Sequence, residues 1–308
     1  MQNPVIIREV GLRDGLQSIS AIMPTAHKKA WIAAAFAAGQ REIEVGSFVP
    51  ADLLPQLADT AELVAYAKTF RGLTVSVLVP NMKGAQKAIE AGADVMLLPL
   101  SASHAHSLAN LHKTPQEVVT EIGHIRAARD AAGSKCLIEI GLSTAFGCTL
   151  QGKIEESHVL NLISRVLENG VDRVGLADTV GYADPLMVHS LFTKAIALAK
   201  GKLACGHFHD TRGLGLANVF AAWQAGASRF DATLGGMGGC PHAPGASGNV
   251  ATEDVAYLFQ SMGVNTGQKF DALIELRTQL AGWLDGIALH GSIWRAGLPK
   301  SMLNHDER

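Results

Sequence analysis

Short apolar runs alternate with longer amphipathic stretches along most of the chain. Residues 5–10 form a β-branched run that stops at Gly11, and residues 25–38 carry Ala, Trp, Ile and Phe at helical spacing. The first pattern is typical of a buried strand and the second of a helix with one apolar face. The chain therefore begins with a strand-helix unit, and the same order recurs up to about residue 262.

The pattern predicts eight such units. The predicted strands are residues 5–10, 41–45, 73–79, 94–98, 136–140, 173–176, 203–209 and 228–234. The predicted helices are residues 25–38, 51–68, 83–91, 114–131, 154–168, 185–199, 216–225 and 252–261. Eight strand-helix units match a closed (β/α)8 TIM barrel. An open doubly wound sheet also alternates strand and helix, but no GxGxxG follows the first strand, so its dinucleotide-binding form has little support.

The end of the chain breaks the alternation. Residues 263–308 contain no further clear strand, and residues 270–288 have helix-like apolar spacing. Length alone would also allow two domains. We expect one TIM-barrel catalytic domain over residues 1–308, with residues 263–308 as additional C-terminal helices that form an appendage.

Composition excludes several classes of partner. Apolar residues make up 48%, charged residues 18%, and the formal net charge is -2. Such a chain has no basic field for nucleic acid or an anionic membrane. No run approaches ~18 apolar residues, and a basic segment followed by an apolar run is absent from the N-terminus. Cys136, Cys148, Cys205 and Cys240 show no CxxC pairing, which suits a reducing compartment. We expect a cytoplasmic protein that acts on a small molecule.

Two histidines at the end of the seventh predicted strand indicate a metal site. His207 and His209 are two residues apart, so both can point to one face of a strand. Asp14 follows the first strand, and a carboxylate with two imidazoles suits Mg, Mn, Fe, Co or Zn. Asn249 could add a neutral oxygen. The alternatives are histidines that only satisfy hydrogen bonds beside Asp210, and an Asp14 that is ordinary turn chemistry.

Other polar residues also follow strand ends, where a TIM barrel carries its chemistry. Arg13 stands beside Asp14 and could meet a developing oxyanion or form an ion pair with Glu9, Glu44 or Asp178. The remaining candidates at strand ends are Gln17, Glu44, Ser143, Asp178 and Thr179. The loop after the eighth strand is rich in glycine and holds Cys240, which a position over a metal site would favour as a reactive thiol.

A second pair of histidines follows the fourth strand. His104 and His106 lie in the sequence SASHAHS among small polar residues. We expect a loop here, because no strand would align the two rings. A loop that contacts substrate or is solvated is favoured over a second metal site.

Taken together, the motifs resemble the 3-hydroxy-3-methylglutaryl-CoA (HMG-CoA) lyase family of TIM-barrel metallolyases. They are EVGLRDGLQ at 9–17, IEVGSFVP at 43–50, VPNMKG at 79–84, GLADTVG at 175–181, HFHDTRGLGLANV at 207–219 and GGMGGCPHAPGASGNVATEDV at 235–255. The resemblance covers nearly the whole barrel. It implies cleavage of HMG-CoA to acetyl-CoA and acetoacetate, with a divalent cation, Mg2+ or Mn2+, as cofactor.

The resemblance also implies roles for the residues. The metal ligands would be Asp14, His207, His209 and Asn249. Arg13 would stabilise the oxyanion, and Glu44, Asp178 and Cys240 would be catalytic-site residues. Arg13, Gln17, Ser143 and Thr179 are expected to contact an acyl-CoA substrate. The appendage and the resemblance together suggest a homodimer.

Two segments depart from the family pattern, and both lie where substrate recognition is expected. Residues 18–23 lack the usual Asn-Glu-Lys, and residues 103–106 read Ser-His-Ala-His in place of Ser-Glu-x-Phe. A related thioester, such as citramalyl-CoA or a longer 3-substituted 3-hydroxyglutaryl-CoA, is therefore an alternative substrate. The competing functions are a related aldolase or acyl-CoA condensing enzyme and a noncatalytic barrel that binds acyl-CoA.

Overall fold

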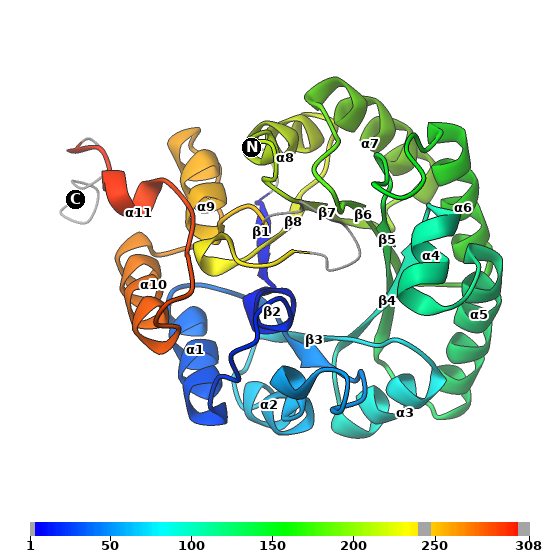
Figure 1. The fold of residues 1–308 in the computed structure, drawn as a ribbon, viewed down its shortest axis with the longest axis horizontal. Helices are drawn as coiled ribbons and strands as arrows, with labels where there is room; N and C mark the ends of the chain where they lie inside the picture. The colour runs from blue at the N-terminus through cyan, green and yellow to red at the C-terminus, as the bar shows by residue number, and fades with distance from the viewer. Residues whose placement is uncertain (1–3, 240–247, 301–308) are drawn as a thin grey trace.

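Eight parallel strands close into a barrel in the order of the chain (Figure 1). The computed structural model describes residues 4–239 and 248–300. The strands are β1 Ile6–Glu9, β2 Glu42–Ser47, β3 Thr74–Leu78, β4 Val95–Ser101, β5 Leu137–Ser143, β6 Arg173–Asp178, β7 Leu203–Phe208 and β8 Arg229–Ala232. The barrel closes where Ile6 of β1 pairs with Arg229 of β8. The predicted TIM barrel is confirmed.

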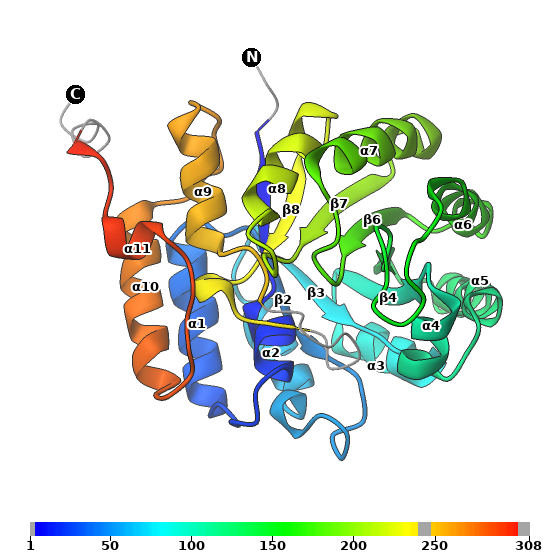
Figure 2. The same cartoon turned by 45° about the horizontal axis from the view of Figure 1, so that its top comes forward.

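Helices surround the barrel and connect successive strands (Figure 2). They are α1 Thr25–Ala37, α2 Thr60–Ala67, α3 Met82–Ala91, α4 His104–Leu111, α5 Pro115–Ala131, α6 Glu156–Glu168, α7 Pro185–Ala199, α8 Gly215–Gln224 and α9 Thr252–Ser261. Most bounds agree with the apolar spacing to within one or two residues. The exact ends are set by caps: Thr114 and Glu117 form a capping box at the start of α5.

Two predictions of secondary structure were wrong: one helix was drawn too long, and one helical turn was expected as a loop. The segment predicted as one helix over residues 51–68 contains a 3-10 turn, Pro55–Leu57, before α2 begins at Thr60. Pro55 excludes the helical conformation at Leu54, whose ψ is 73°. The segment with His104 and His106, expected as a loop, forms the first turn of α4.

The inside of the barrel carries charged side chains in place of the branched apolar residues that usually fill such barrels. Arg8 lies at the centre of this layer and is 2% exposed. Its Nε is 2.7 Å from Asp231 Oδ1, and its Nη2 is 2.8 Å from Glu139 Oε1. Arg229 forms a further ion pair with Glu42. These pairs compensate one another, so the buried charges are tolerated beneath the barrel mouth.

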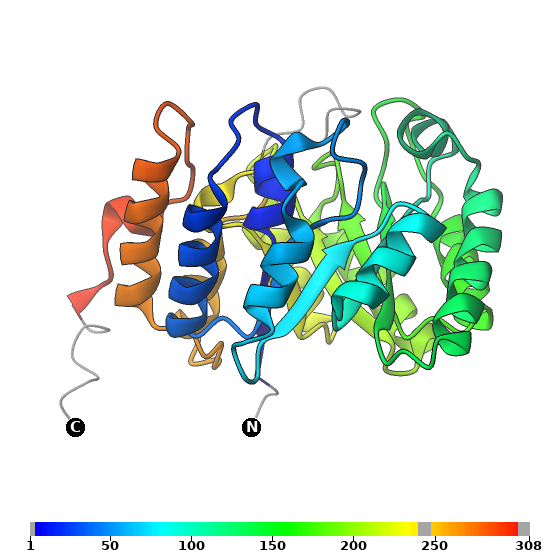
Figure 3. The same cartoon turned by 90° about the horizontal axis from the view of Figure 1, so that it is seen from below.

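The C-terminal helices pack beside the barrel. Helix α10, Phe270–Trp283, lies alongside α1 in the side view (Figure 3), and α11, Ile293–Ala296, contacts α9. His27 stacks on Trp283, with 5.2 Å between ring centroids. Residues 270–283 bear out the predicted helix, although it ends before residue 288. Within the described ranges, no helix is both long and apolar enough to cross a membrane.

Candidate active site

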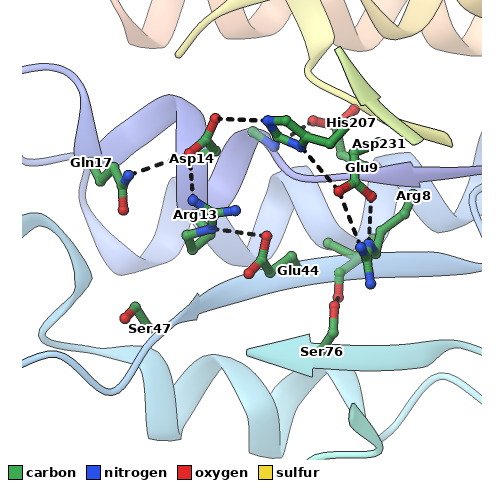
Figure 4. Close-up of polar contacts among 12 residues, drawn as sticks. Arg8, Glu9, Arg13, Asp14, Gln17, Glu44, Ser47, Ser76, His207 and Asp231 are labelled. Carbon is green, nitrogen blue, oxygen red and sulfur yellow. Dashed lines mark hydrogen bonds and ion pairs between the residues drawn. The ribbon is translucent and has the colours of Figure 1, made fainter. Parts of the chain in front are cut away.

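The site lies at the mouth of the barrel, between the carboxyl ends of β1 and β7, which flank β8. A π-helical turn, Gly11–Gly15, follows β1 and carries Arg13 and Asp14, which are both 6% exposed. His207 stands near the end of β7, and His209 follows it. The close-up in Figure 4 shows Arg13, Asp14 and His207 gathered at one place, although Asp14 and His207 lie far apart in the sequence. The turn is what aims Asp14 across the barrel mouth.

Asp14, His207 and His209 form a group that could hold a metal ion. One potential ligand atom from each residue lies within 4.8 Å of the others. The two Nε2 atoms are 3.2 Å apart, and His207 Nε2 is 4.0 Å from Asp14 Oδ2. Three ligand atoms converge from two separate elements, as a metal site with open positions for substrate requires.

The donor atoms of this group fit a cation. Asn249 Nδ2 donates to Asp14 Oδ2 over 2.6 Å, while Asn249 Oδ1 is buried and has no hydrogen-bond partner in the described structure. Burial and His207 lower the pKa of His209 to about 4, so this imidazole is neutral at pH 7. A neutral imidazole, a carboxylate and an unpartnered amide oxygen are all electron-pair donors, and a divalent cation would satisfy them together.

Arg13 and Glu44 form the second part of the site. Arg13 pairs with Asp14 through Nη1, and its Nε is 2.8 Å from Glu44 Oε2. Burial raises the pKa of Asp14, but Arg13 and the two imidazoles outweigh it and hold that pKa below its usual value. Gln17 Nε2 donates to Asp14 Oδ1 over 3.3 Å. The guanidinium is therefore fixed beside the Asp14 carboxylate, as Figure 4 shows.

Asp231 is a site residue that the sequence analysis missed. It lies on β8 directly beside β7, and its Oδ2 is 3.0 Å from His207 Nδ1. Arg8 and the hydrogen bond to His207 outweigh burial and keep the pKa of Asp231 well below its usual value. An acid in the middle of an apolar strand was the available signal. Its partner could not be found without the register that sets Asp231 opposite His207.

Two other predicted site residues, Asp178 and Thr179, lie at the end of β6, but their side chains form hydrogen bonds with the surrounding loops. Asp178 accepts hydrogen bonds from the amides of Tyr182 and Ala183 at 2.8 and 3.1 Å. Thr179 Oγ1 accepts from the Thr144 amide at 2.8 Å. In the described part of the chain, neither side chain forms a hydrogen bond or an ion pair with Asp14 or the two histidines. Burial raises the pKa of Asp178.

The loop that contains Cys240 begins against the metal group. Cys240 itself lies outside the described residues. Gly238, two residues before it, has φ 119°, and a Cβ there would come within 2.3 Å of Asn249 Nδ2. Only glycine therefore allows this loop to pass so close to Asn249 and Asp14.

The comparisons with known proteins agree with this geometry. The profile of the HMGL-like family matches residues 4–280. The chain belongs to the HMGL-like family. It is 35% identical to the hydroxymethylglutaryl-CoA lyase of Bacillus subtilis over 281 residues, covering 91% of this chain and 92% of that protein. It is also 35% identical to the (R)-citramalyl-CoA lyase of Chloroflexus aurantiacus over 303 residues, covering 95% of each.

Solved structures of this family share the fold. An HMG-CoA lyase from Acinetobacter baumannii, in complex with coenzyme A and 3-methylmalate, superposes with a TM-score of 0.91 at 38% identity and covers 96% of each chain. The Bacillus subtilis HMG-CoA lyase gives a TM-score of 0.89 at 33% identity, covering 96% of this chain and 99% of that one. The family resemblance read from the motifs is confirmed.

Within this HMGL-like barrel, Glu9 joins three segments that surround the site. Glu9 Oε1 accepts from the amides of Gly11 and Leu234, and Oε2 accepts from Thr252 Oγ1 over 2.7 Å. Burial raises the pKa of Glu9 to about 7. One buried carboxyl thus fixes the turn that carries Asp14 and the start of the glycine-rich loop. An acid at the end of a strand was the only sign of this role in the sequence.

Proposed function

We propose that this protein is a divalent-metal-dependent carbon-carbon lyase that cleaves HMG-CoA to acetyl-CoA and acetoacetate. The observation that carries the proposal is the convergence of Asp14, His207 and His209 at the mouth of an HMGL-like barrel. Arg13, held beside Asp14, adds the positive charge that such a reaction needs. A noncatalytic barrel would have no need for this buried and mutually paired set.

We assign the cation to Asp14, His207, His209 and the free Oδ1 of Asn249. Mg2+ or Mn2+ suits the carboxylate and amide oxygens, and Mn2+ also accepts imidazole readily. When bound, the cation lowers the pKa of the substrate hydroxyl and fixes its orientation. The fit rests on donor chemistry: neutral His209 has one ring nitrogen with a free electron pair, and Asn249 Oδ1 is an unpartnered oxygen in the described structure.

The chain's own residues account for the remaining steps. A base removes the hydroxyl proton, the bond between C2 and C3 of the acyl group breaks, and its electron pair passes to the thioester as an enolate. Arg13 meets the charge that develops on the thioester oxygen. Cys240 donates the proton that converts the enolate to acetyl-CoA, a role that rests on the family resemblance.

The candidates for this base are Asp14, His207 and Asp178. Asp14 and His207 would both serve as metal ligands, and a ligating nitrogen cannot accept a proton. Asp178 is the remaining acid of the predicted set, and its raised pKa suits proton transfer. Its carboxylate is engaged by two loop amides, so it would have to reach the substrate hydroxyl through its remaining lone pairs.

Other features belong to the same proposal. We expect an acyl-CoA to contact Arg13, Gln17, Ser143 and Thr179, and we expect Glu44 to hold Arg13 in place. The single catalytic domain over residues 1–308, its appendage at 263–308, the homodimer and the cytoplasmic location stay predictions. Nucleic acid and membranes are not expected as partners.

A second substrate has specific support. The match to the (R)-citramalyl-CoA lyase covers 95% of this chain, and residues 18–23 and 103–106 depart from the pattern usual in the lyases. Citramalyl-CoA is one methylene shorter than HMG-CoA between the carbinol carbon and the carboxylate. The same bond cleavage would release acetyl-CoA and pyruvate.

The deciding experiment is an assay of acetyl-CoA release from purified protein. HMG-CoA and citramalyl-CoA are each supplied with Mg2+ or Mn2+, with a chelator control. Chelator-sensitive cleavage of HMG-CoA supports the proposed function and substrate. Cleavage of citramalyl-CoA alone would replace the substrate, and turnover of neither would contradict the lyase assignment.

A further inference from the structure

A chain of three hydrogen-bonding side chains lies at the ends of β4 and β5. His106 is in the first turn of α4 and is only 2% exposed. Its Nδ1 is 2.7 Å from Ser101 Oγ, and Ser101 Oγ is 2.9 Å from Ser143 Oγ. Ser101 was not among the predicted site residues, and His106 was expected only as part of a loop that contacts substrate or is solvated. The helix begins here because Ser103 Oγ caps the amide of His106 at 3.1 Å, and this turns the imidazole back toward the strands.

The chain shares the barrel wall with the proposed metal ligands. Ser101 and Ser143 are register partners, and Ser143 has the same parity on β5 as Glu139, which meets Arg8 inside the barrel. Leu142 of β5 pairs with Leu176 of β6, so the next residues, Ser143 and Ala177, lie side by side. Ala177 in turn pairs with His207 of β7. With strands ~4.8 Å apart, Ser143 lies two strands, or about 10 Å, from His207 along the wall. The side chains of Ser143 and His207 fill part of that distance, and an acyl group of five carbons can bridge the rest.

The wall between the two groups is open to solvent. Gly141, Ser143 and Ala177 point inward yet are partly exposed, unlike the buried residues beside them. A Cβ on Gly141 would meet only Leu97, at 3.5 Å. Small side chains therefore leave the inner wall accessible between Ser143 and His207, where a substrate held at the metal group would extend.

The order of protons in the chain decides what Ser143 offers. A hydroxyl has one proton to donate, and a neutral imidazole has one N–H. If His106 Nδ1 donates to Ser101, then Ser101 donates to Ser143, and the Ser143 proton is free to point at the Leu100 carbonyl, 3.2 Å away, or at a ligand. In that order a ligand acceptor replaces only the Leu100 contact. An imidazole with its proton on Nδ1 would thus set the direction of the whole chain.

We propose that Ser143 donates a hydrogen bond to the free carboxylate of the acyl group, and that Ser101 and His106 are positioning residues that direct its proton. This inference rests on the proposed function. It names the group of the substrate, the free carboxylate, that the inner barrel wall at the ends of β4 and β5 would bind. A carboxylate has two oxygens with about four acceptor directions, so the metal group and Ser143 can engage it from different sides. The departure at residues 103–106 then has a physical role, because a phenyl ring at position 106 could not orient Ser101.

The test measures ligand binding as well as turnover. The full chain is titrated with 3-hydroxy-3-methylglutarate, the free acid, and separately with coenzyme A, in the presence of Mg2+. Ser143→Ala should weaken binding of the acid by about 10- to 100-fold, the usual effect of a lost hydrogen bond to a charged group, and leave coenzyme A binding unchanged. In turnover of HMG-CoA the same variant should raise KM more than it lowers kcat.

Variants of the positioning residues separate this role from a structural one. Ser101→Ala and His106→Phe should each weaken acid binding by about three- to tenfold, and the double variant should be no weaker than the worse single variant, because both interrupt one chain. His106→Asn, whose side-chain amide can replace Nδ1, should restore most of the loss. Ser107→Ala is the matched control: its hydroxyl is buried on the same helix but bonds the Lys113 carbonyl.

Each outcome decides the proposal. Unchanged acid binding in Ser143→Ala overturns it, whatever the turnover. Equal weakening of acid and coenzyme A binding also overturns it, because the chain would then only hold the fold. If the wild-type protein cleaves neither thioester but binds the acid through Ser143, the proposed function fails while the carboxylate contact stands.

Discussion

His207 is held from behind by Asp231, with 3.0 Å between Nδ1 of the imidazole and Oδ2 of the carboxylate. Because Nδ1 donates to Asp231, Nε2 is the ring nitrogen that faces His209 and Asp14. Arg8 holds the same carboxylate from the other side, at 2.7 Å from Oδ1. The orientation of a proposed metal ligand therefore depends on charges inside the barrel.

Asp231→Asn is expected to lower metal affinity by about 10- to 100-fold, because an amide can donate to Nδ1 and so reverse the orientation of the imidazole proton. Metal dissociation constants measured by calorimetry, with Mn2+ as the probe, check this. Asp130→Asn, on the surface of α5, is the control. Wild-type affinity in Asp231→Asn would show that the hydrogen bond does not orient the ligand.

His209→Ala is expected to lose metal and activity together. The substitution removes one of the three converging ligand groups and leaves Asp14 and His207 too few to hold a divalent ion tightly. Metal content by mass spectrometry and acetyl-CoA release are measured on the same samples. His189→Ala, an exposed histidine on α7, should keep both. Activity without bound metal would contradict the metal-dependent mechanism.

Cys240→Ser is expected to keep its metal and lose most of its turnover. A serine hydroxyl is a far weaker acid than a thiol, so it would donate a proton to the enolate slowly. The measurement pairs kcat with metal content. Cys148→Ser, a buried cysteine on the loop after β5, is the comparison. Normal turnover in Cys240→Ser would show that the proton comes from another group.

Glu9→Gln is expected to reduce the pH dependence of stability. Burial raises the pKa of Glu9 from 4.5 to about 7, so the folded protein binds a proton there that the unfolded chain has released. The free energy of unfolding then falls as pH rises between these values, by up to about 1.4 kcal/mol per pH unit for one proton. Glutamine stays neutral and donates to Thr252, as the protonated acid would.

Urea unfolding between about pH 5 and pH 8 tests this expectation. The stability of Glu9→Gln relative to wild type should rise with pH, while Glu90→Gln, an exposed control on α3, should follow the wild type. Glu253 has a pKa raised by burial to about 7 as well, so the variant should keep part of the slope. Parallel curves for wild type and Glu9→Gln would mean that Glu9 is ionised in the folded state.

The sequence by itself determined the barrel and most of the candidate site. Hydrophobic periodicity is local, so alternating runs identify strands and helices, and a count of eight units admits few closed arrangements. The spacing of His207 and His209 also predicts that their side chains point the same way, because residues two apart share one face of a strand. Asp14 could be grouped with the two histidines because the carboxyl ends of all strands lie at one face of the barrel.

Only the tertiary structure decided which partners these residues have. The contact of Asp231 with His207, the anchoring by Glu9, and the bond between His106 and Ser101 all depend on strand register and on the angle at which a helix begins. Hydrogen bonds form over about 3 Å, and periodicity locates an element only to within a residue or two. A shift of one residue turns a side chain to the opposite face of its strand, so these contacts required the assembled barrel.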